Sequence, residues 1–103
     1  MIFEELDFQI TTIGELALRR RRIPKLGELD VYEVKLGEEF LMSSLFNEAE
    51  RQLSKLSLGA LEKDDLDVVV GGLGLGYTAA AALEDARVSS LVVIEYLAPV
   101  IEW

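Results

Sequence analysis

This sequence of 103 residues contains no cysteine and no histidine. Without thiols, a disulfide framework and a thiolate metal site are excluded, and without imidazoles an ordinary zinc site is nearly excluded as well. Nucleophilic catalysis by cysteine and acid–base catalysis by histidine are excluded for the same reason. We therefore assign no metal ligand to the chain, and no catalytic cysteine or histidine.

Basic residues are also scarce, because ten lysines and arginines face nineteen acids and give a formal charge of -9 at pH 7. A surface of that sign repels phosphate backbones and anionic lipids, so neither nucleic acid nor a membrane is an expected partner. No apolar run approaches the roughly 18 residues of a membrane span, and the N-terminus lacks the pattern of a secretory signal. These absences predict a cytoplasmic protein.

The first part of the chain has the pattern of β-structure. Apolar and polar side chains alternate there, most regularly from Leu29 to Leu36, and Gly14 and Gly37 interrupt the alternation. This pattern predicts short antiparallel strands. We place a β-rich N-terminal segment at residues 1–42.

A helix is expected next. Leucine and alanine recur at steps of three and four residues from Leu45 to Ala60, with charged side chains on the other face. Ser43 or Ser44 is the expected N-cap, since a serine hydroxyl can accept a hydrogen bond from a free amide of the first turn.

Two apolar runs follow the helix, at Leu66–Val70 and Leu91–Ile94. Unbroken apolar runs are typical of parallel strands buried on both faces. An alanine-rich helix at residues 77–83 joins them, so the pattern predicts a β-α-β unit with a crossover connection. The expected fold class is α/β, with residues 43–103 as the first part of a Rossmann-like domain and the whole chain as one compact unit.

A run of glycines lies between the first parallel strand and the helix after it. Gly72, Gly74 and Gly76 lack a Cβ atom, which permits a tight turn and a close approach of a ligand to the backbone. Nineteen residues after Gly76, Glu95 ends the second strand. A carboxylate at that position can accept hydrogen bonds from both hydroxyls of a ribose, so the loop and the acid together predict a nucleotide site.

Two nucleotide classes fit this loop. Gly74-Leu75-Gly76-Tyr77-Thr78-Ala79 also satisfies the Gly-x-Gly-x-x-Ala fingerprint of an NAD(P)-binding oxidoreductase. In that register Gly71 and Gly72 belong to the strand and weaken it, whereas a Gly72-x-Gly74-x-Gly76 loop begins directly after the valines and favours adenosylmethionine-type binding. A third interpretation is a non-catalytic oligomerising module, in which the glycines only permit a tight turn and Glu95 is a solvated strand end.

Three segments carry a family resemblance: Val68-Val69-Val70-Gly71-Gly72-Leu73-Gly74-Leu75-Gly76, Leu91-Val92-Val93-Ile94-Glu95 and Pro99-Val100-Ile101-Glu102. They resemble the first two nucleotide-binding motifs of spermidine synthases, which belong to the class I S-adenosylmethionine-dependent methyltransferase superfamily. The resemblance implies a partial Rossmann-like methyltransferase fold and a transferase of polyamine biosynthesis. It implies adenosylmethionine or decarboxylated adenosylmethionine as the cofactor, with Gly72, Gly74 and Gly76 at the methionine part and Glu95 at the ribose.

The same resemblance places the family's polyamine-binding acids and general base beyond the position of Trp103, so it implies no turnover by this chain alone. Two parallel strands also leave an exposed sheet edge that something must cover. We therefore expect a homodimer.

Four consecutive arginines, Arg19 to Arg22, stand out in an acidic chain. Alternation along a strand divides them between two faces. We interpret them as a charged edge strand that discourages aggregation, with a phosphate or nucleic-acid patch as the alternative.

Overall fold

A computed structural model describes residues 2–24 and 27–103 of the chain. The chain divides into two compact units, residues 1–46 and 47–103, rather than the single unit that we predicted. The division falls four residues beyond the expected end of the β-rich segment at residue 42. An isolated bridge between Ser43 and Phe46 keeps the turn after the last strand with the first unit.

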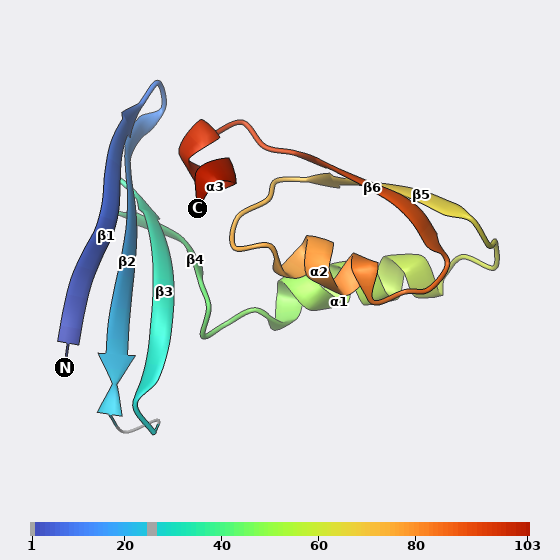
Figure 1. The fold of residues 1–103 in the computed structure, drawn as a ribbon, viewed down its shortest axis with the longest axis horizontal. Helices are drawn as coiled ribbons and strands as arrows, with labels where there is room; N and C mark the ends of the chain where they lie inside the picture. The colour runs from blue at the N-terminus through green and yellow to red at the C-terminus, as the bar shows by residue number, and fades with distance from the viewer. Residues whose placement is uncertain (1, 25–26) are drawn as a thin grey trace. The chain divides into compact units, whose positions relative to one another are not determined.

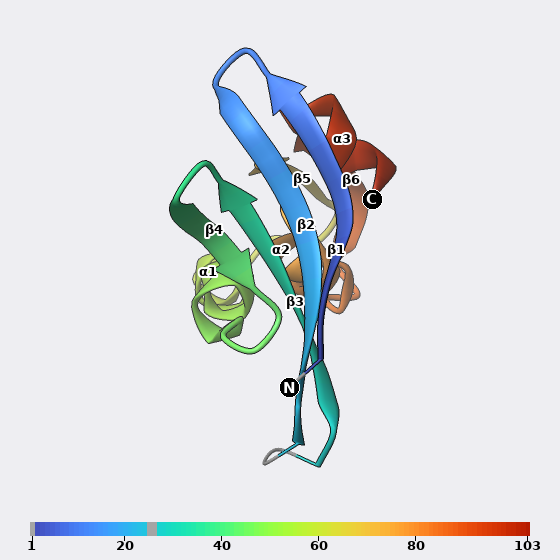
Figure 2. The same ribbon diagram turned by 90° about the vertical axis from the view of Figure 1, so that its left-hand side faces the viewer.

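The first unit is one sheet of four antiparallel strands in the order β1-β2-β3-β4, which confirms the predicted β-rich segment (Figures 1 and 2). Each strand pairs with the next along the chain, and Figure 2 shows the four strands lying side by side with a marked twist. Their bounds are Ile2–Thr11 for β1, Gly14–Ile23 for β2, Leu29–Leu36 for β3 and Glu39–Ser43 for β4.

The arginine run lies on β2, an inner strand, so its interpretation as an edge strand is wrong. Acidic residues on both neighbouring strands face the arginines. Arg20 forms an ion pair with Glu4 of β1, and Arg22 Nε lies 2.9 Å from Asp30 Oδ1 of β3. The positive charge is therefore neutralised within the sheet.

Glu33 of β3 is the buried centre of this charge network, with only 4% of the residue exposed. Arg19 Nε lies 3.2 Å from Glu33 Oε1, and Arg21 Nη2 lies 3.3 Å from Glu33 Oε2. The Arg19 guanidinium also lies over the rings of Phe3 and Phe40, at 4.9 and 4.8 Å from their centroids. Two cations thus compensate one buried carboxylate, which is the condition for burying a charge in a protein.

The second unit combines three helices with two parallel strands, β5 and β6, which confirms the predicted parallel pairing across an intervening helix. The fold class is therefore mixed α/β, although two strands alone do not define a Rossmann-like sheet. The bounds are Glu48–Gly59 for α1, Leu66–Gly71 for β5, Tyr77–Leu83 for α2, Val88–Ile94 for β6 and Ala98–Glu102 for α3 (Figure 1).

The core of the second unit lies between α1, α2 and one face of the two strands. Leu58 of α1, Leu66 of β5 and Ala82 of α2 are buried together, and partly buried Val68, Val88 and Leu91 pack against them. The two helices are also joined by a hydrogen bond, since the buried Ser54 hydroxyl of α1 donates to the carbonyl oxygen of Thr78 of α2 at 2.6 Å.

The predicted N-cap of α1 is wrong, because Asn47 and neither serine precedes the helix. Ser43 is the last residue of β4, and its hydroxyl accepts a hydrogen bond from the Leu45 amide. The Ser44 hydroxyl accepts one from the Tyr32 amide at 2.8 Å. Both hydroxyls therefore accept hydrogen bonds at the end of the antiparallel sheet. The helix begins further along the chain, at Glu48, than the helical periodicity indicated.

Arg87 connects the end of α1 to the start of β6. Its guanidinium donates hydrogen bonds to the carbonyl oxygen of Leu58 (2.8 Å), in the last turn of α1, and to that of Leu61 (2.7 Å), two residues beyond the helix. Asp85 accepts from Arg87 at 2.8 and 3.1 Å, and this pairing lowers the pKa of the Asp85 carboxyl to about 2.

Candidate functional site

The strand-to-helix loop, which we predicted at residues 71–76, occupies residues 72–76. Gly71 is the last residue of β5, and the Gly72 amide extends the pairing by donating to the Ile94 carbonyl at 2.7 Å. A turn then closes where the Gly76 amide donates to the Leu73 carbonyl at 2.8 Å, and α2 begins at the next residue. The chain therefore changes from strand to helix within five residues.

The three glycines of the loop all have positive φ angles: +89° at Gly72, +55° at Gly74 and +89° at Gly76. Residues with a Cβ atom rarely adopt this conformation, because the Cβ crowds the backbone. A Cβ atom added at Gly72 or Gly76 would meet no atom within 4 Å. The backbone conformation, and not a shortage of space, therefore requires glycine at these two positions.

Glu95 follows β6 directly, and its side chain faces the loop, as predicted. Its Oε1 atom accepts hydrogen bonds from the amides of Leu73 (2.8 Å) and Gly74 (3.4 Å), and its Oε2 atom accepts one from the Leu97 amide (3.0 Å). The parallel pairing of β5 and β6 brings the two strand ends together and so places the acid beside the loop. The loop glycines and the acid thus form one site.

The carboxyl group of Glu95 has a pKa below its ordinary value. Burial by itself raises this pKa, but hydrogen bonds from the amides of Leu97, Leu73, Gly74 and Tyr96 stabilise the charged form and outweigh it. The side chain is therefore a carboxylate at neutral pH. It bears a full negative charge at the ends of the two parallel strands.

Glu95 also has a role that the sequence did not indicate, since it holds the loop in shape. The hydrogen bonds from Leu73 and Gly74 fix two successive amides against β6. No residue type marks these donors, because they are backbone groups. The only sequence signal for these two hydrogen bonds is the acid at the end of the second strand. That strand was expected to run parallel to the strand before the loop.

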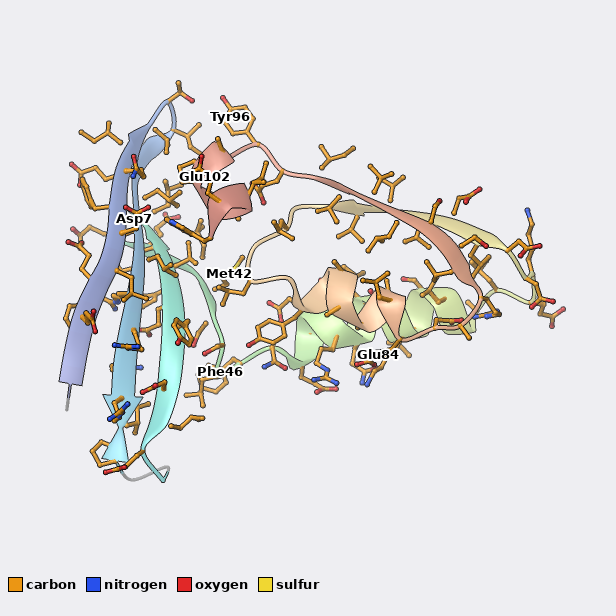
Figure 3. The ribbon with its side chains drawn as sticks, in the orientation of Figure 1. Asp7, Met42, Phe46, Glu84, Tyr96 and Glu102 are labelled. Carbon is orange, nitrogen blue, oxygen red and sulfur yellow. The ribbon has the colours of Figure 1, made fainter. Side chains whose placement is uncertain are left out.

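Tyr96 adjoins the acid and was not singled out from the sequence. Figure 3 labels it on the segment between β6 and α3, where its side chain projects outward from the backbone, and the residue is largely exposed. An exposed aromatic ring next to a strand-end acid offers a flat apolar surface on which another ring can stack. The only sequence signal for Tyr96 is that it directly follows Glu95.

No protein-family model matches the chain, and neither a curated protein nor a solved structure matches it. The resemblance to spermidine synthases therefore rests on three sequence segments alone, residues 68–76, 91–95 and 99–102. Among the helices of residues 2–24 and 27–103, none combines the length and the apolar surface that a membrane span requires.

Proposed function

We propose that the second unit is the nucleotide-binding part of a spermidine synthase-like transferase, and that it binds adenosylmethionine or decarboxylated adenosylmethionine. The observation that carries the proposal is the position of the Glu95 carboxylate, 2.8 Å from the Leu73 amide and therefore beside a loop of three positive-φ glycines. Acid and loop meet at the carboxyl ends of parallel strands, where open α/β sheets bind their ligands.

The residues present fit this cofactor. The open space at Gly72 and Gly76 leaves room for a ligand to reach the backbone, and the ionised Glu95 suits the hydroxyls of a ribose. The 3.4 Å hydrogen bond from Gly74 is the longest of those to Glu95, so it is the one that a ribose hydroxyl would replace first. When bound, the cofactor's sulfonium supplies an activated carbon for attack by an amine, and the protein supplies the positioning.

The loop register bears on the choice between the two nucleotide classes. Gly71 lies within β5 and Gly72 pairs with Ile94, so the argument that these glycines would weaken the strand does not hold. The positive φ angles instead alternate at Gly72, Gly74 and Gly76, and a Gly-x-Gly-x-Gly loop accounts for all three.

One observation favours the dinucleotide alternative. Ala79 is buried in α2 at the third position of the Gly-x-Gly-x-x-Ala fingerprint, where a small residue lets helix and strand pack closely. An NAD(P)-binding fragment is therefore the second candidate, and a titration has to include it.

The proposal is tested by calorimetric titration of the chain with adenosylmethionine, methylthioadenosine and NAD in parallel. We expect binding of the first two and none of NAD. Binding of NAD alone would establish the dinucleotide alternative. No binding of any of the three would leave the loop with a structural role and would refute the proposal.

The role of Glu95 is tested by a cycle of one protein change and one ligand change. We expect Glu95→Ala to weaken methylthioadenosine binding by about 1–3 kcal/mol, because charge-assisted hydrogen bonds to the ribose are lost. Glu102→Ala, at an exposed acid of α3, is the matched control and should leave binding unchanged.

The cycle separates ribose recognition from support of the loop. If Glu95 binds the 2′-hydroxyl, the 2′-deoxy analogue loses affinity for the unaltered chain but loses none for the Glu95→Ala variant. Equal losses in both proteins would show that Glu95 acts only through the loop.

A further inference from the structure

The outer edge of β5 presents backbone groups that no strand pairs with in the described part of the chain, since β5 and β6 form a sheet of two strands. Gly72 donates its amide to Ile94 beside β6. Because successive residues of a strand turn their backbone groups to opposite sides, the N–H and C=O groups of Asp67, Val69 and Gly71 face the other edge.

This edge lacks the features that guard the two edges of the first sheet. The β1 edge carries the acids Glu4, Glu5 and Asp7 and an irregular register between Glu5 and Asp7, and β4 has only five residues. Charges, irregularities and short length are the means by which edge strands avoid pairing. In contrast, β5 continues as Val68-Val69-Val70-Gly71 after its one acid, without lysine or proline.

An apolar groove runs beside the same edge. It has a volume of about 200 Å³ and lies between α1, β5 and α2, with Leu53, Leu58, Val68, Val70 and Ala82 among its lining residues. Leu53 is 61% exposed although it faces this groove. The β5 edge therefore combines free hydrogen-bonding groups with uncovered apolar surface.

We propose that a second copy of this chain covers the edge, with the two β5 strands pairing antiparallel about a two-fold axis at Val69. Val69 then faces Val69 of the other copy, and Asp67 faces Gly71. All of these residues turn their backbone groups to the edge, so each pair exchanges both of its hydrogen bonds. The result is a continuous sheet in the order β6-β5-β5-β6, which passes the three strands that a sheet needs for stability of its own.

Self-complementarity is the reason for choosing a second copy as the occupant. The acid of each strand falls opposite a residue without a side chain, and a β-branched residue falls opposite its own kind. An axis at Asp67 would oppose two carboxylates, and an axis at Val68 would set Asp67 against an exposed valine. The two grooves then lie on the same face of the continuous sheet, because a two-fold axis normal to the sheet keeps both α1 helices on that face.

The proposal is tested by sedimentation equilibrium of the purified chain at micromolar concentration. We expect a dimer, and we expect Val69→Lys to weaken it on the order of tenfold or more, because two lysines would then lie directly opposite each other. Val92→Lys is the matched control: Val92 pairs with Val69 on the same face and is 54% exposed against 64%, but it lies one strand away from the axis. It should leave the dimer unchanged.

A mixing experiment tests the register itself. Val69→Lys and Val69→Glu chains should each be largely monomeric, and an equimolar mixture should form a heterodimer, because residue 69 meets only its counterpart in this arrangement. A monomeric unaltered chain would overturn the proposal, as would a dimer that Val69→Lys leaves intact or that Val92→Lys weakens equally. None of these outcomes depends on nucleotide binding, so this proposal and the proposed function can fail separately.

Discussion

Gly71 and Gly72 are adjacent, and at neither would an added Cβ atom meet another atom within 4 Å. They differ in backbone conformation, since Gly72 has a φ of +89° and Gly71 lies in a regular strand. Any difference between alanine substitutions at these positions therefore measures the conformational requirement alone.

We expect Gly72→Ala to lower the free energy of unfolding by about 1–2 kcal/mol, the usual cost of a left-handed backbone for a residue with a Cβ atom. Gly71→Ala should be neutral or stabilising by up to about 1 kcal/mol, because it reduces the freedom of the unfolded chain. Urea unfolding followed by circular dichroism measures both values. Equal losses at the two positions would contradict the assignment.

At this scale the sequence indicated which residues come together but not how they bond. Gly72, Gly74, Gly76 and Glu95 were identified because glycine spacing and a strand-end acid are local signals. The hydrogen bonds from the Leu73 and Gly74 amides to Glu95 depend on backbone donors, which are the same for almost every residue type. The Ser44 hydroxyl was misassigned for a related reason, since its partner, the Tyr32 amide, lies twelve residues away.

Among the elements, α1 and β6 depend on each other through Asp85 and Arg87. Arg87 donates hydrogen bonds to the Leu58 carbonyl, in the last turn of α1, and to the Leu61 carbonyl, just after that helix. Asp85 holds the Arg87 guanidinium in place by pairing with it. Loss of the charge on Asp85 should therefore loosen the end of the helix as well as the turn before β6.

This connection has a definite pH dependence. The Asp85 pKa is about 2 in the folded chain against an ordinary 3.8, so its contribution to stability is complete above about pH 4 and is lost as the pH falls through about 2. In that interval the unfolded chain binds more protons than the folded chain, and stability rises with pH. We expect an Asp85→Asn variant to have a lower melting temperature than the unaltered chain at pH 6 and a smaller decline between pH 4 and pH 2.

Thermal melts at several pH values measure this difference. Glu102→Gln, at an exposed acid of α3, is the control and should keep the full decline. A parallel decline in the Asp85→Asn variant would show that other carboxylates account for the acid sensitivity.

Periodicity predicted most of the elements, because helical and strand patterns depend on neighbours in sequence. It gave α2 at residues 77–83 and placed the parallel strands correctly. It did not distinguish an inner strand from an edge strand, and β2 was misplaced for that reason. The neighbours of β2 depend on residues that are distant in sequence from the arginines, such as Glu4 and Asp30. No local pattern contains that information.

For the whole molecule, charge opposes the proposed dimer. Each copy has a formal charge of -9, so two copies repel each other at long range. Raising the ionic strength from about 0.01 M to about 0.1 M shortens the screening length from roughly 30 Å to roughly 10 Å. We therefore expect the dissociation constant of the dimer to fall as sodium chloride is added, as measured by sedimentation.

The mixture of Val69→Lys and Val69→Glu chains provides an internal comparison. Lysine and glutamate attract each other at the two-fold axis of this heterodimer, and salt screens that attraction as well. Added salt should therefore lower the dissociation constant of the heterodimer less than that of the unaltered dimer. A dimer that salt weakens would point to an interface held by opposite charges, which the apolar β5 edge does not offer.

The topology of the two sheets also determines the order in which their strands can meet as the chain is made. In the first unit, Thr11 pairs with Gly14, so β1 and β2 can begin to join at the turn soon after both have left the ribosome. In the second unit, Gly71 pairs with Ile94 and Val68 with Leu91, so β5 has no partner until β6 has been synthesised. During that delay both edges of a valine-rich strand are bare, and a nascent chain is most exposed to aggregation when such strands are unpaired. Slower translation of residues 72–94 would lengthen the delay, so codon choice in this segment should affect the yield of soluble protein more than codon choice in β1 or β2.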